Sequence, residues 1–248
     1  MTNVLMLASF GLEIVECGGA LARHVAAGDR VYAAVTLCRP ESRPQVQAAA
    51  AILGVTEVEF LGFPYGEFAV DVPSKEKIVS LVRRVKPDIV ITQDPVHAQH
   101  DLDPDRRIMA LLYTESFALA GREWHVAECG GHAPYPAPTI YYMTPEEPNC
   151  IVEIGPVFGL KQKALQALQV QMAFTAQVLR QRVAPEAMRH LVPNLDDLAG
   201  DDATLGLQLS QQFFTSQAVY YGLAGHSGAV LGEPYRREGA FVTEGLLK

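Results

Sequence analysis

The chain of 248 residues has 20 lysines and arginines against 28 aspartates and glutamates, which gives a net charge of −8. This charge disfavours nucleic acid and anionic membranes as partners. No apolar run approaches the roughly 20 residues needed to cross a bilayer, and the first residues lack the pattern of a signal peptide. The four cysteines form no Cys-X-X-Cys pair, so we expect reduced thiols and a cytoplasmic location.

The first half of the chain alternates apolar strand-like segments with helical patterns. We expect strands at 4–8, 31–37, 58–61 and 89–92, and helices at 18–27, 45–53 and 75–85, the last with Ser74 as its N-cap. Such alternation forms βαβ units, so the sequence predicts an α/β fold with a Rossmann-like, doubly wound, mostly parallel sheet. Ligands bind beyond the carboxyl ends of such strands. The loops 9–17, 61–71 and 93–105 should therefore converge on one site.

The second half of the chain is predicted to be more helical. A helix over 106–119 precedes a glycine- and proline-rich segment (130–138), which we interpret as a lid or an excursion at a strand edge. Further elements are expected as strands at 139–143 and 150–154, and as helices at 156–170, up to 182, and at 203–221. We interpret residues 1–248 as one domain, with a parallel core over 1–122 and the late elements over 123–248. The apolar last helix favours a homo-oligomer.

One motif follows the first strand. It reads Ala8-Ser9-Phe10-Gly11-Leu12-Glu13 and, after three intervening residues, Cys17-Gly18-Gly19. This pattern resembles the opening of the PIG-L/LmbE de-N-acetylase superfamily, where a strand runs into Ala-His-Pro-Asp-Asp-Glu and then Cys-Gly-Gly. The family's later Asp-Pro and His-Pro-Asp-His correspond to Asp94-Pro95 and to Asp103-Pro104-Asp105-Arg106.

Within that superfamily, the chain is most similar to the 4-oxalomesaconate hydratase branch, which acts on a carboxylated product of aromatic-ring cleavage. The similar features are Gly18-Gly19-Ala20, Ile52-Leu53-Gly54 and Asp94-Pro95. The resemblance implies an LmbE-like fold with a helical C-terminal part. It also implies the activity of a hydratase (lyase) or of a hydrolase such as a deacetylase.

The resemblance implies a zinc site whose three ligand positions hold Ser9, Leu12 and Arg106 in this chain. Leucine has no donor atom, and an arginine is not deprotonated to bind a metal. We therefore expect no zinc and no other cofactor at these positions. An alternative is a rebuilt zinc site made from His97, His100 and Asp101.

Several polar residues near the motif are candidates for function. We expect Glu13, Asp105 and His100 to transfer protons as catalytic residues. Substrate contacts are expected from the site loops and one C-terminal turn, namely from Ser9, Asp94, His97, Asp103, Arg106 and His226. Structural roles remain open: Asp103 or Asp105 as a helix cap, a Glu13–Arg106 salt bridge, and histidines that lie on the surface.

The residues leave three functions open. The first is an enzyme that has lost the family's zinc and acts on a small, anionic, carboxylated molecule as a hydratase, lyase or hydrolase, with Arg106 binding the anion. The second is a catalytically inactive paralogue that binds a ligand or serves as a subunit of an assembly. The third is a metal-dependent N-deacetylase that uses the rebuilt site.

Overall fold

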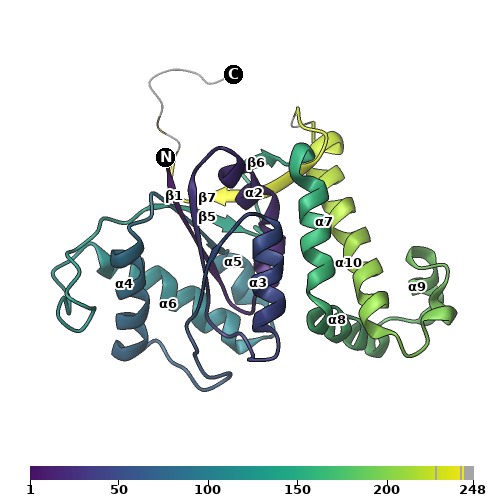
Figure 1. Cartoon of the computed structure of the whole chain (residues 1–248), viewed down its shortest axis with the longest axis horizontal. Coiled ribbons are helices and arrows are strands. Elements are labelled where there is room, and N and C mark those ends of the chain that lie inside the picture. Colours follow the sequence, from purple (N-terminus) through teal and green to yellow (C-terminus); the bar gives the residue numbers. More distant parts are fainter. Residues whose placement is uncertain (227, 241, 243–248) are drawn as a thin grey trace.

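The computed structural model of the protein describes residues 1–226, 228–240 and 242. Seven strands of this described part form one sheet in the order β3-β2-β1-β4-β5-β7-β6 (Figure 1). In chain order they are β1 (Asn3–Ala8), β2 (Arg30–Val35), β3 (Glu57–Phe60), β4 (Ile89–Gln93), β5 (Thr139–Met143), β6 (Cys150–Glu153) and β7 (Gly232–Arg237). The strands β1 to β5 are parallel, and β7 pairs antiparallel with β5 and β6. The sheet is thus mostly parallel and Rossmann-like, as the sequence predicts.

Helices cover both faces of this sheet. The longer ones are α2 (Gly18–Ala26), α3 (Arg43–Ile52), α4 (Val72–Val85), α6 (Pro104–Ala120), α7 (Phe158–Ala167), α8 (Gln169–Arg182) and α10 (Asp202–Val219). The shorter ones are α1 (Glu13–Glu16), α5 (Pro95–His100), α9 (Pro185–Leu191), the turns η1 (Gly155–Val157) and η2 (Leu195–Leu198), and the π-helical turn η3 (Tyr220–Ala224). None of the helices in the described residues has both the length and the apolar character needed to cross a membrane.

The central strand β1 shows why the fold is doubly wound. Val4, Met6 and Ala8 pack into the core on the side of α2, α3 and α7. Leu5 and Leu7 point to the opposite side, where α4 and α6 cover the sheet. A strand buried on both faces has a continuous apolar sequence rather than an alternating one, and the β1 sequence has this character.

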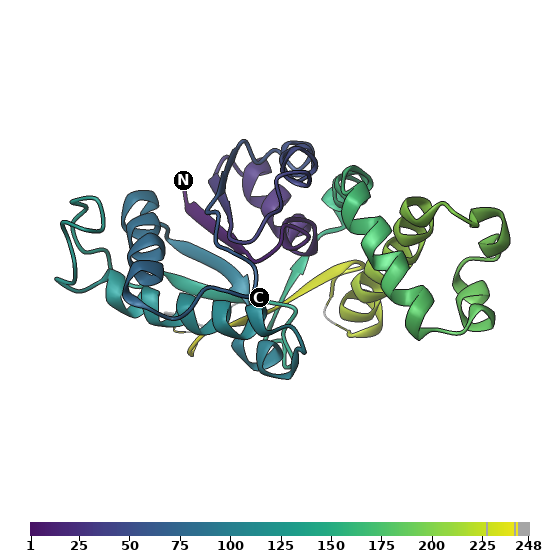
Figure 2. The ribbon, with the colours of Figure 1, turned by 90° about the horizontal axis from the view of Figure 1, so that it is seen from below.

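The helices α8, α9 and α10 form a separate layer that extends from one end of the sheet (Figures 1 and 2). They enclose a small core of their own. α8 and α10 pack closely at Gly206, because a Cβ atom there would lie 1.8 Å from the backbone oxygen of Met172. Only glycine fits this crossing.

The turn that precedes α2 is held by the last strand. Glu233 of β7 accepts hydrogen bonds from the amides of Gly19 (3.0 Å) and Ala20 (2.9 Å) and lies 2.6 Å from Nζ of Lys161. A Cβ on Gly19 would lie 2.3 Å from Ile154, so the second glycine of the Cys-Gly-Gly motif is required by close packing. These contacts join the start of the chain to α7 and β7.

Among the details that differ from the prediction are the following four. The N-cap of α4 is Asp71, whose side chain accepts the Ser74 amide, so the helix begins at Val72 rather than after Ser74. The segment 93–105 is not all loop, because it contains α5. The strand β7 was not predicted. The segment 130–138 lies on the α4 and α6 side of the sheet, where Tyr135 joins the core.

Candidate functional site

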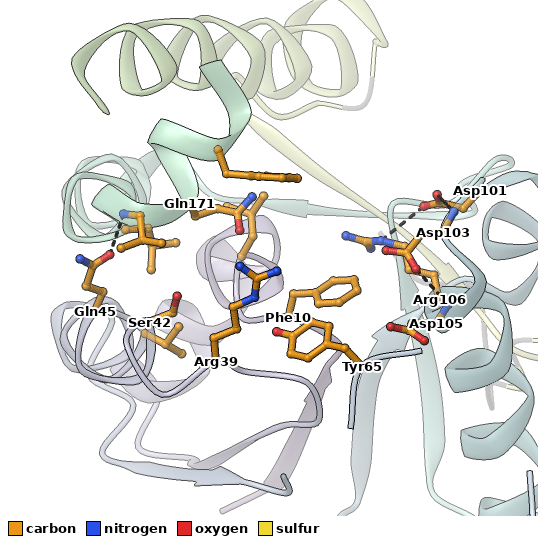
Figure 3. Close-up of a pocket in the computed structure, with 15 residues that line it drawn as sticks. Phe10, Arg39, Ser42, Gln45, Tyr65, Asp101, Asp103, Asp105, Arg106 and Gln171 are labelled. Carbon is orange, nitrogen blue, oxygen red and sulfur yellow. Dashed lines mark hydrogen bonds and ion pairs between the residues drawn. The ribbon is translucent and has the colours of Figure 1, made fainter. Parts of the chain in front are cut away.

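A pocket of about 430 Å³ lies at the carboxyl ends of β1, β2, β3 and β4. All three loops that were expected to converge contribute to it, together with the loop after β2 and the start of α8. The residues that line the pocket are Phe10, Leu12, Arg39, Ser42, Gln45, Val46, Tyr65, Asp101, Asp103, Asp105, Arg106, Leu168, Val170, Gln171 and Phe174. The helical C-terminal part thus supplies one wall (Figure 3).

Two stacked rings lie at the middle of the pocket. The rings of Phe10 and Tyr65, called the ring pair below, have centroids 5.9 Å apart and planes 19° apart. The guanidinium of Arg39 lies 5.4 Å from the Tyr65 ring, and that of Arg106 lies 5.1 Å from the Phe10 ring. The ring pair therefore separates two arginines by an apolar, flat surface, and each cation faces an aromatic ring.

Arg106 lies in the first turn of α6 and contacts three acceptors. Its Nη1 is 3.5 Å from Oε1 of Glu13 and 3.5 Å from Oε1 of Gln93, and its Nε is 3.3 Å from Oδ2 of Asp101. The Arg106 side chain is 22% exposed and faces the pocket. Its charge is therefore shared between the protein's own carboxylates and the pocket.

Glu13 is buried behind the pocket wall rather than within the lining. Its carboxylate accepts the amide of Gly11 at 2.8 Å and the amide of Phe10 at 3.2 Å. The Glu13 carboxylate thus has three donors around it, namely these two amides and the guanidinium of Arg106. This arrangement fixes the turn from β1 into α1, and it includes the Glu13–Arg106 ion pair that was the structural alternative for these two residues.

Three aspartates form one end of the pocket, called the acid end below. Asp101 and Asp103 lie between α5 and α6, and Asp105 lies in the first turn of α6. Asp103 is the N-cap of α6 and accepts the Asp105 amide at 2.9 Å, while Asp101 accepts the Asp103 amide at 2.9 Å. Asp105 accepts the amide of Gly66 at 3.0 Å. Burial raises the pKa of the Asp105 carboxyl, and the neighbouring Asp103 raises it further.

Two other predicted residues are buried away from the lining. Ser9 donates from Oγ to Oε1 of Gln93 at 3.3 Å. Asp94 is fully buried, caps α5, and accepts two hydrogen bonds from Arg236 at 3.0 and 2.8 Å. Asp94 thus ties β7 to the end of β4, which is a structural role.

The three predicted histidines lie outside the pocket lining. Nδ1 of His97 is 2.8 Å from Oε1 of Glu146. His100 is exposed at the end of α5, and His226 is exposed just after η3. Of the predicted site residues, the structure therefore brings Asp103, Asp105 and Arg106 together in the pocket.

Several pocket residues were missed in the sequence. Arg39 and Tyr65 follow β2 and β3. Because ligands bind beyond the carboxyl ends of such strands, both residues could have been predicted from their positions in the sequence. Phe174 and Gln171 lie on α8, and no sequence pattern placed that helix beside the sheet. Glu16 was also missed, although it lies near Arg106 and outside the pocket lining. Its burial and the charge of Glu13 raise its pKa to about 7.

The residues at the resembling zinc positions do not provide a zinc-binding donor set. Ser9 Oγ is hydrogen-bonded to Gln93, Leu12 has no donor, and Arg106 is a cation. In the part of the chain that the structure describes, no three histidine, cysteine, aspartate or glutamate side chains are arranged to hold a metal ion.

The fold is shared with solved structures of the PIG-L/LmbE type. A conserved protein from Thermus thermophilus matches with a TM-score of 0.68 and 20% identity, over 98% of this chain and 97% of that protein. The 4-carboxy-2-hydroxymuconate hydratase of Pseudomonas putida matches with a TM-score of 0.67 and 20% identity over 100% of both chains.

A third structure, the N,N′-diacetylchitobiose deacetylase of Pyrococcus horikoshii, matches with a TM-score of 0.67 and 20% identity, over 94% of this chain and 82% of that enzyme. No protein-family model matches the sequence, and no curated protein sequence matches it. At this level of identity the structural matches establish the fold. The LmbE-like fold that the sequence motif implied is thereby confirmed.

Proposed function

We propose that this protein is an LmbE-like enzyme that works without the zinc of that fold and acts as a hydratase, lyase or hydrolase on a small carboxylated molecule. Arg39 carries the proposal. It lines the pocket, and no carboxylate of the described residues lies within ion-pair distance of it. A guanidinium without a carboxylate partner, in a pocket with a flat apolar surface, is suited to bind a carboxylate.

Asp105 is the residue we assign to proton transfer. It lines the same pocket and has a raised pKa, so its carboxyl takes up and releases a proton nearer to neutral pH than an exposed aspartate does. In a hydration, Asp105 takes a proton from water while the oxygen attacks the β-carbon of an unsaturated carboxylate. The electron pair moves onto the carboxylate, where Arg39 stabilises it, and Asp105 returns the proton to the α-carbon.

The experiment compares turnover and binding. Crotonate, cinnamate and muconate are incubated with the protein, and loss of the conjugated double bond is followed by ultraviolet absorbance; N-acetylglucosamine tests deacetylation. Arg39→Gln should weaken carboxylate binding at least tenfold, whereas Asp105→Asn should abolish turnover and preserve binding. Arg23→Ala, at an exposed site on α2 outside the pocket, is the matched control. Carboxylate binding that Arg39→Gln leaves unchanged would refute the proposal.

Metal analysis tests the zinc part separately. Purified protein should contain no stoichiometric zinc, and incubation with a chelator should leave activity and melting temperature unchanged. One zinc ion per chain would favour the rebuilt-site deacetylase instead. In that case, His97→Ala and His100→Ala should release the metal.

A catalytically inactive paralogue is the second candidate, and one observation favours it. Arg106 forms ion pairs with Glu13 and Asp101. It therefore fills the position that resembles a zinc ligand with a structural contact rather than with a group that takes part in chemistry. A protein that binds carboxylates through Arg39 but converts none of the three unsaturated acids would support this candidate.

A further inference from the structure

The two ends of the pocket differ in charge. Around Arg39 the lining is polar but uncharged, with Ser42, Gln45 and Gln171 as neighbours in the lining (Figure 3). Gln45 is itself occupied, because its Oε1 accepts the amide of Val170 at 2.9 Å. Arg39 is thus the uncompensated charge at this end, and this end attracts an anion.

The acid end, made by Asp101, Asp103 and Asp105, has more carboxylates than cations. Arg106 is the lining cation beside it, and its charge is also shared with Glu13 behind the wall. Asp101 is also contacted by the guanidinium groups of Arg106 and, at its backbone oxygen, of Arg107. The other hydrogen bonds to these aspartates come from backbone amides, which carry no net charge. This end therefore favours a cation and repels a second anion.

The ring pair lies between the two ends. Figure 3 shows Phe10 and Tyr65 side by side, with Arg39 on one side and the three aspartates on the other. Phe174 of α8 also lines the pocket and is 58% exposed. The middle of the pocket is therefore suited to a flat apolar segment of a ligand.

We infer that the pocket selects an amino-carboxylate, with its carboxylate at Arg39, a flat apolar segment along the ring pair, and an ammonium group at the acid end. This inference rests on the proposed function, because it takes the same pocket as the ligand site and names the class of ligand. It also separates the two arginines. Arg39 binds the anion, and Arg106, which is paired with Glu13 and Asp101, positions the acid end.

Four small probes of matched shape test this inference by calorimetry: 4-(aminomethyl)benzoate, 4-methylbenzoate, 4-methylbenzylamine and terephthalate. The amino-carboxylate should bind at least tenfold more tightly than 4-methylbenzoate and 4-methylbenzylamine. Terephthalate should bind more weakly than 4-methylbenzoate, because its second carboxylate meets the acid end. A second amino-carboxylate, 4-(2-aminoethyl)benzoate, has a longer spacing between its two charges, in case the first is too short to reach both ends of the pocket. Tenfold tighter binding of either amino-carboxylate would meet the expectation.

Two variants assign the ends of the pocket. Arg39→Gln should weaken 4-methylbenzoate and both amino-carboxylates at least tenfold. Asp103→Asn removes one negative charge and should reduce the preference for an amino-carboxylate over 4-methylbenzoate at least threefold, while 4-methylbenzoate itself binds no more weakly. Arg23→Ala should leave the affinities for 4-methylbenzoate and for both amino-carboxylates unchanged.

The outcomes separate this inference from the proposed function. Terephthalate that binds as tightly as the better amino-carboxylate would overturn the inference and leave the carboxylate site at Arg39 standing. The same holds if 4-methylbenzylamine matches the amino-carboxylates while 4-methylbenzoate still depends on Arg39. If no carboxylated probe binds in an Arg39-dependent way, both the proposed function and the inference fail.

Discussion

The carboxylate of Glu13 and the guanidinium of Arg106 face each other across the inner wall of the pocket, with Oε1 3.5 Å from Nη1. Glu13 is held in place by two backbone amides, and it is almost completely buried. Its negative charge therefore depends on Arg106 for compensation, since neutral amides alone leave a net charge in the interior. The arginine at the resembling ligand position thus supports the turn after β1.

Replacing Arg106 by Met should destabilise the protein by about 2 kcal/mol, because Glu13 loses its cation. In a Glu13→Gln background the same replacement should cost less, since no buried charge is left unpaired. Urea unfolding of the four proteins measures this coupling. Arg107→Met, at the exposed neighbouring position, is the control. An equal cost of the Arg106 replacement in both backgrounds would show that the pair contributes nothing.

Lys161→Met should be the most destabilising of the single changes considered, by about 3–5 kcal/mol, since it leaves Glu233 without its cation. Both side chains are 3% exposed, and Nζ lies 2.6 Å from Oε2. Lys163→Met, on the same helix but outside this buried pair, should change the free energy of unfolding by less than about 0.5 kcal/mol. Similar losses from both variants would contradict a buried ion pair.

Gly19→Ala should destabilise the protein by about 2 kcal/mol or more, because the new methyl group would overlap Ile154 and Glu233. Gly159 of α7 offers the matched comparison, since a Cβ there meets no atom within 4 Å. Gly159→Ala should stabilise the protein by ~0.5–1 kcal/mol through helix propensity. Thermal unfolding compares the two, and a harmless Gly19→Ala would argue against the packing of Gly19 on Ile154.

The stability should fall as the pH rises toward neutrality because of Glu16. Its pKa rises from an ordinary 4.5 to about 7 in the folded protein, through burial first and the charge of Glu13 second. The folded state then holds the proton more tightly than the unfolded chain, so this contribution is complete below pH 4.5 and is lost by about pH 7.

Glu16→Gln removes that titration. The variant should match the parent protein in melting temperature at pH 5 and exceed it at pH 8, as measured by differential scanning fluorimetry. Glu41→Gln, at an exposed carboxylate, serves as the control. A melting-temperature difference that does not change between the two pH values would contradict the assignment to Glu16.

The sequence predicts the first half of the fold well because its signals are local. Each early strand is an apolar run followed by a helix, and Asp103 occupies the cap position that short polar side chains favour. The strand β7 was missed since Gly232–Arg237 contains a proline and charged residues. Its place in the sheet is set by partners far away in the chain, chiefly Asp94 and Gly19.

The site was predicted in part for the same reason. Asp103, Asp105 and Arg106 follow β4 closely in the chain, and a motif marks them. Arg39 and Tyr65 lie in loops without a motif, so only the topology of the sheet assembles them with the others. The contribution of Phe174 depends on how α8 packs against the sheet, which is a tertiary property.

The position of β7 also sets an order of assembly. β6 pairs with β7 alone among the described strands, and β7 lies between β5 and β6 although it is the last of the three in the chain. During synthesis, β6 therefore has no hydrogen-bonding partner until Gly232–Arg237 has left the ribosome. The nascent protein must carry an unpaired strand edge through the synthesis of α7 to α10, and that interval is where it is most exposed to aggregation.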